Sequence, residues 1–125
     1  HREFLYSDDM ANACVFLMRL PDSEFDALLD GSLRAPLINI GSGAEVTIRD
    51  LAEQAARTTG CTAALRFDTS KPDGMPRKLL DVSRLHALGW RASIALQEGM
   101  SRAYADFRRQ VASQPIHKEQ AARVQ

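Results

Sequence analysis

Apolar residues recur at intervals of three and four in three stretches of the chain, residues 7–20, 47–59 and 93–112. This is the spacing of one face of an α-helix, so each stretch is predicted to be helical and to bury its apolar face. The residues expected on the three buried faces are Met10, Cys14, Leu17 and Met18; Ile48, Leu51, Ala52, Ala55 and Ala56; and Leu96, Met100, Ala103, Phe107 and Val111.

Short polar side chains stand where each long helix is expected to begin. Ser7, Asp8 or Asp9 opens the first, Thr47 the second and Ser93 the third. Such side chains accept hydrogen bonds from the unpaired N–H groups of the first turn, and acidic ones also favour the positive end of the helix dipole. We therefore expect a side-chain cap at the start of each helix.

Prolines and glycines predict where the helices end. The first helix ends before Pro21, and Gly60 is a natural stop for the second. A short turn of helix is expected around residues 25–29, within a variable excursion over residues 21–36. Another short helix is expected over residues 83–88, stopped by Gly89.

Short apolar runs at residues 4–6, 37–40 and 64–67 separate these helices and are predicted to be strands. Strands that alternate with helices predict an α/β fold. Three strands this short make only a small sheet, so the unit is expected to need a larger partner.

The segment Lys71-Pro72-Asp73-Gly74-Met75-Pro76-Arg77-Lys78 is the strongest candidate for binding chemistry. Two prolines and an Asp-Gly pair predict a rigid turn, which could hold one carboxylate and several cations at little ordering cost. Arg offers a planar fork to phosphate oxygens, and Lys a point charge. The competing interpretation is an ordinary solvated surface turn.

Composition excludes several classes of function. The chain has 16 Lys and Arg against 16 Asp and Glu, a balance that argues against binding to nucleic acid or to an anionic membrane. No apolar run approaches the ~20 residues that span a bilayer. Cys14 and Cys61 lack metal-ligand spacing, and Cys14 is expected to be a buried, reduced thiol.

Four stretches carry a family resemblance, namely residues 1–11, 38–43, 47–52 and 67–82, followed by Leu88-Gly89-Trp90. Together they resemble the C-terminal part of the GDP-L-fucose synthase family, within the extended short-chain dehydrogenase/reductase superfamily. The run Lys-Pro-Asp-Gly-x-Pro-Arg-Lys-Leu-Leu-Asp is the sharpest, because related dehydratases and epimerases typically carry Arg-Pro-Gly or Arg-Pro-Ala-Glu there.

The motifs of hydride chemistry in that superfamily are not found in this chain. Val46 stands at the third-glycine position of the Gly41-Ser42-Gly43 stretch, so the dinucleotide fingerprint fails. Neither Tyr6 nor Tyr104 is followed by Lys four residues later. We therefore expect a fragment without catalytic residues, inactive when isolated.

The resemblance implies the organisation of the protein. Residues 1–112 would form the small substrate-binding lobe of an extended Rossmann-type reductase, with short strands and three main helices. Residues 113–125 would be a polar, disordered tail. The parent protein is expected to be a cytoplasmic homodimer that binds a GDP-sugar, with NADPH held mainly by the Rossmann half, and without metal, nucleic acid or membrane partners.

The resemblance also implies substrate contacts for Arg2, Asp73 and Lys78. Arg2 and Lys78 would bind the diphosphate, and Asp73 would accept from a sugar or ribose hydroxyl or a guanine amino group. Alternatively, Arg2 forms a surface ion pair with the adjacent glutamate. Arg77 is a weaker candidate, because it can pair with Asp81.

Four further residues are expected to have structural roles. Trp90 and Tyr104 are predicted to pack rather than to stack on guanine, His86 to lie at the surface or at a helix end, and Asn39 to stabilise a turn. Two rival functions remain, the lobe of another NAD(P)-dependent nucleotide-sugar epimerase or dehydratase, and a standalone binding module without chemistry.

Overall fold

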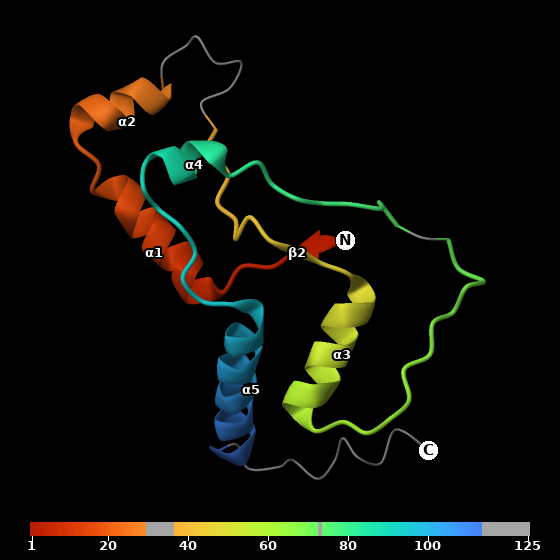
Figure 1. Cartoon of the computed structure of the whole chain (residues 1–125). Coiled ribbons are helices and arrows are strands. Elements are labelled where there is room, and N and C mark those ends of the chain that lie inside the picture. Colours follow the sequence, from red (N-terminus) through yellow and green to blue (C-terminus); the bar gives the residue numbers. More distant parts are fainter. Residues whose placement is uncertain (30–36, 73, 114–125) are drawn as a thin grey trace.

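The computed structural model describes residues 1–29, 37–72 and 74–113, which form five helices and one two-stranded sheet (Figure 1). The helices are α1 (Ser7–Met18), α2 (Asp22–Leu29), α3 (Ile48–Thr59), α4 (Ser83–Ala87) and α5 (Leu96–Ser113). Strands β1 (Arg2–Glu3) and β2 (Glu45–Val46) pair antiparallel, with Arg2 opposite Val46 and Glu3 opposite Glu45.

The α/β class is confirmed in this coarse form, but the predicted strand positions are wrong. Residues 4–6, 37–40 and 64–67 form no strand. Apolar composition alone does not make a strand, because a strand needs a second backbone to satisfy its N–H and C=O groups. In the described part of the chain, the strand pairing is made by β1 with β2, which borders the run at residues 4–6 but not the other two.

Helix α1 buries a different face from the predicted one. Ala13 is fully buried, and Leu17 packs against the core as expected. Met10 and Met18 are instead 41% and 84% exposed, and the thiol of Cys14 is also exposed. The sequence 7–18 is apolar on several sides, so its periodicity could not decide which side turns inward.

Asp9 accounts for the orientation of α1. Its carboxylate, only 4% exposed, accepts hydrogen bonds from the Ser93 hydroxyl (2.8 Å) and from the N–H groups of Ser93 (3.1 Å) and Ile94 (2.9 Å). Burial by itself raises the pKa of Asp9, but these hydrogen bonds and the charge of Arg102 outweigh it, so that the pKa is lowered. Ala13, one turn later on the same face, is thereby turned inward.

The predicted caps are partly confirmed. Thr47 accepts from the N–H of Asp50 at 3.0 Å, and Gly60 ends α3 at a φ of 71°. The caps predicted for the other two long helices are wrong. Tyr6 occupies the N-cap of α1 without a side-chain hydrogen bond, and Ser93 precedes α5 but donates to Asp9.

The core lies where α1, α4 and the segment before α5 meet. Ala13 and Leu85 are fully buried, and Trp90 is 5% exposed. The indole of Trp90 donates to Asn12 Oδ1 at 2.8 Å, so its polar atom is satisfied. Trp90 is a packing residue, as predicted.

Helices α3 and α5 lie side by side (Figure 1). The hydroxyl of Tyr104 donates to the carbonyl of Thr59 at 3.4 Å, so Tyr104 links the two helices. Thr59 is the last residue of α3, so the later turns of α5 extend past it. Of the predicted buried positions of α5, Leu96 and Met100 are half-buried, whereas Ala103, Phe107 and Val111 are exposed.

The remaining helices follow the prediction more closely. Helix α2 contains the turn expected at residues 25–29, and α4 is followed by Gly89 at a φ of 95°. None of the described helices is long and apolar enough to cross a membrane. The predicted tail, apart from Ser113 at the end of α5, lies outside the described residues.

Candidate functional site

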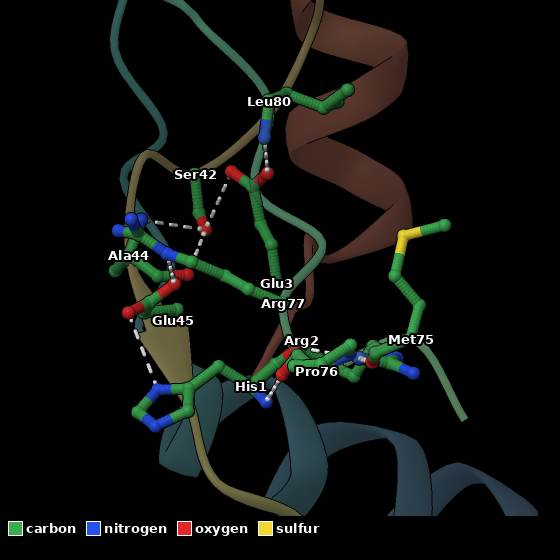
Figure 2. A network of polar contacts seen from close by, with 10 residues as sticks. All are labelled: His1, Arg2, Glu3, Ser42, Ala44, Glu45, Met75, Pro76, Arg77 and Leu80. Atoms are coloured by element: carbon green, nitrogen blue, oxygen red, sulfur yellow. Dashed lines mark hydrogen bonds and ion pairs between the residues drawn. The ribbon is translucent and has the colours of Figure 1, made fainter. Parts of the chain in front are cut away.

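Arg2 and Lys78, far apart in the sequence, lie side by side in the structure. They form a parallel β-bridge, in which the N–H of Lys78 donates to the carbonyl of His1 at 3.2 Å (Figure 2 shows the surrounding contacts). The charged loop, as we name residues 71–80, is therefore joined to β1 at Lys78, and two of the three predicted substrate residues are brought together. Asp73, the third, lies outside the described residues.

The Arg2 guanidinium is fixed against the charged loop. Its Nη1 donates to the carbonyls of His1 and Met75, both at 2.7 Å. A Cβ added at Gly74 would lie 3.6 Å from Nη2, so the guanidinium rests beside this glycine. Arg2 thus presents a positive charge in a set position.

Lys78 lines a hollow of about 370 Å³ together with Arg2, Glu3, Gly41 and Leu80. Its ammonium group makes no hydrogen bond or ion pair with the residues that the structure describes. Ligand pockets have volumes of roughly 300–1,000 Å³ and few polar groups, so the hollow is large enough for part of a ligand. The two cations outnumber the single carboxylate of Glu3, whose oxygens already accept hydrogen bonds from the protein, so the hollow favours an anionic group.

Arg77 has a different partner from the predicted one. Its Nε donates to Glu45 Oε2 at 2.7 Å, and this hydrogen bond and the charge of Glu45 raise the pKa of Arg77. Asp81 instead accepts from Ser83 N–H at 3.0 Å, and hydrogen bonds from Ser83 lower its pKa. Arg77 is thus engaged with β2, which leaves Arg2 and Lys78 as the cations at the hollow.

Glu3 is a site residue that sequence reasoning missed. No ion pair joins it to Arg2, contrary to the alternative considered above, because neighbouring side chains on a strand point to opposite faces. Its Oε1 accepts from Gly43 N–H at 2.7 Å. Figure 2 shows two further contacts, from Ser42 Oγ to Oε1 at 3.3 Å and from Leu80 N–H to Oε2 at 2.9 Å. The only sequence signal was the glycine-rich stretch after residue 40.

Two further predicted residues have modest roles. The amide of Asn39 donates to the carbonyl of Asp81 at 2.9 Å, so it links two distant segments rather than closing a local turn. His86 is half-buried on α4 and lies close to Gly43, where an added Cβ would be 3.5 Å from its Cε1. Within the described residues, no group of three or more His, Cys, Asp or Glu could hold a metal ion.

Comparison with known proteins gives close sequence relatives, although no family model matches the chain. Putative GDP-L-fucose synthase 2 of Arabidopsis thaliana is 47% identical over 103 residues, which are 82% of this chain and 28% of the relative. GDP-L-fucose synthase of Escherichia coli K12 is 45% identical over 106 residues, 85% of this chain and 32% of the relative. The chain thus spans about 30% of the length of these relatives.

Solved structures agree with the sequence relatives. A GDP-6-OMe-4-keto-L-xylo-heptose reductase from C. jejuni has a TM-score of 0.78 and 34% identity, over 87% of this chain and 31% of that one. A GDP-mannoheptose C4 reductase from Campylobacter jejuni, solved with NADP bound, has a TM-score of 0.71 and 33% identity, over 86% and 31% of the two chains. The predicted resemblance to GDP-L-fucose synthases and GDP-sugar reductases of the extended short-chain dehydrogenase/reductase superfamily is confirmed.

Proposed function

We propose that this chain is the C-terminal, substrate-binding lobe of a GDP-L-fucose synthase. The parent protein would convert GDP-4-keto-6-deoxy-mannose to GDP-L-fucose by 3,5-epimerisation and NADPH-dependent reduction of the 4-keto group. The observation that carries the proposal is the meeting of Arg2 and Lys78 beside one hollow. Identity of 42–47% to named GDP-L-fucose synthases supports it.

The lobe's part in the reaction would be to hold the GDP moiety. Arg2 would offer its remaining N–H groups to the diphosphate, and Lys78 a second positive charge. The carboxylate of Asp73 is an acceptor and would repel a phosphate group. We therefore assign it to accept a hydrogen bond from a hydroxyl or amino group of the sugar, ribose or guanine.

The acid, base and hydride chemistry would belong to the rest of the parent protein, together with most of the NADPH site. Large apolar side chains that remain exposed support the need for a larger partner, among them Met18 (84%), Leu37 (69%) and Met75 (67%). A cytoplasmic homodimer remains our expectation for the parent.

The closest rival function is reduction of a different GDP-sugar, such as a heptose. Its support is the TM-score of 0.78 to a reductase of that kind. The sequence identity to that reductase is 34%, against 45–47% for two GDP-L-fucose synthases, and we therefore favour fucose synthesis.

Substrate profiling of the intact protein that carries this chain tests the proposal. We expect NADPH oxidation with GDP-4-keto-6-deoxy-mannose and formation of GDP-L-fucose, and little turnover of GDP-keto-heptoses. The isolated chain, assayed in parallel, should oxidise no NADPH. Preference of the intact protein for a heptose substrate would overturn the assignment, as would turnover by the isolated chain.

A further inference from the structure

At Glu3, a side-chain hydrogen bond replaces the backbone pairing between β1 and the charged loop. Lys78 N–H donates to the carbonyl of His1, so a continued parallel register would next join Leu80 N–H to the backbone carbonyl of Glu3. Leu80 N–H donates instead to the side-chain Oε2 of Glu3, at 2.9 Å. The carboxylate takes the place of the backbone acceptor, and the loop leaves β1 at this point.

A glycine makes room for this carboxylate. A Cβ added at Gly41 would lie only 2.5 Å from Glu3 Oε1, a distance that real Cβ atoms do not tolerate. The same oxygen accepts from Gly43 N–H at 2.7 Å. The side chain is therefore fixed at both oxygens, between residues 41–43 and the end of the charged loop.

We propose that Glu3 is a positioning residue that holds Leu79 and Leu80 away from β1 and so keeps open the hollow beside Lys78. The Glu3 carboxylate accepts from Leu80 N–H, and Glu3, Leu80 and the close-packed Gly41 all line the hollow with Lys78. The inference deepens the proposed function and rests on it, because the ligand of the hollow is taken to be a nucleoside diphosphate.

The variant Glu3→Gln tests this role in the intact protein. An amide of the same size offers an N–H₂ group where a carboxylate oxygen accepts, so one of its two backbone N–H partners loses its acceptor. We expect hydrogen exchange of residues 79–81 or 42–44 to quicken about tenfold or more, and the Kd for GDP to rise about tenfold. Glu53→Gln, the same chemical change at an exposed position of α3, is the matched control and should alter neither.

The exchange rates and the GDP affinity together distinguish the possible outcomes. Faster exchange with unchanged GDP affinity would overturn the role in ligand binding, and weaker GDP binding with unchanged exchange would overturn the positioning mechanism. No change in either reading would overturn both. If the unaltered protein fails to bind GDP, the proposed function fails, whereas the exchange rates still show whether Glu3 holds the loop.

A second variant guards against a simple loss of folding. In the otherwise unaltered protein, Gly41→Ala should displace the carboxylate and weaken GDP binding about tenfold. In a Glu3→Ala background, where no carboxylate remains, Gly41→Ala should cause little further loss of GDP affinity. Equal losses in the two backgrounds would contradict the coupling and overturn the inference.

Discussion

The apolar core and the polar site corner are built from different interactions. The apolar core (Ala13, Leu85 and Trp90) is buried and held by packing. The site corner (β1, residues 41–45 and residues 74–80) is held by hydrogen bonds of side chains to the backbone, such as those of Glu3 and Arg2. Exposed polar contacts contribute little individually, whereas buried aromatic groups contribute several kcal/mol. The core therefore decides whether the chain folds, and the corner decides the shape of the site.

The largest effect is expected in the core. Trp90→Ala should lower the free energy of unfolding by about 3–5 kcal/mol, because it removes a buried aromatic ring and leaves a cavity. Urea unfolding of the chain, monitored by circular dichroism, measures this change in the free energy of unfolding. Trp90→Phe, which loses the hydrogen bond to Asn12 but keeps a ring, should cost only about 1–2 kcal/mol. Equal costs for the two variants would show that packing does not dominate there.

A smaller effect is expected at Asp9, which combines burial with hydrogen bonding. Asp9→Asn should cost about 1.5–3 kcal/mol, the value of a hydrogen bond to a charged group. The pKa of Asp9 is lowered on folding, so its contribution is fully present above the unfolded value of about 3.9 and is lost as the pH falls through the folded pKa.

Urea unfolding at several pH values between 2 and 7 checks the sign of this effect. The loss of stability below about pH 4 should be smaller in Asp9→Asn than in the unaltered chain. Glu53→Gln, at an exposed position of α3 beyond its first turn, serves as the carboxylate control. An identical acid dependence in Asp9→Asn and the unaltered chain would contradict the assigned role.

The smallest effect is expected at Arg77. Its side chain is 64% exposed and its partner is Glu45, so Arg77→Gln should leave the urea midpoint unchanged and alter the Kd for GDP by less than about twofold. Isothermal titration with GDP measures the affinity. A tenfold loss of GDP affinity would place Arg77 in the binding site and would contradict the assignment of binding to Arg2 and Lys78 alone.

Local signals predicted local structure well. Thr47 and Gly60 mark the ends of α3 correctly, because a cap depends on atoms within a few residues. The meeting of Arg2 and Lys78 followed only from the family resemblance, since spacing along the chain does not fix contacts between distant segments.

The failed predictions concern choices that are made by distant parts of the chain. The buried face of α1 follows from the hydrogen bonds of Asp9 to Ser93, and Glu3 finds its partners in two loops. The run at residues 37–40 has strand composition, but in the described part of the chain no second strand pairs with it. Periodicity measures hydrophobic spacing and cannot supply these partners.

Titration of GDP into the intact protein with Lys78→Met or Lys71→Met tests the central claim most directly. Both changes remove one lysine charge from the same loop, but only Lys78 lines the hollow beside Arg2. We expect Lys78→Met to weaken GDP binding about tenfold, and Lys71→Met to change it less than about twofold. Equal affinities in the two variants would contradict the placement of the diphosphate at this corner.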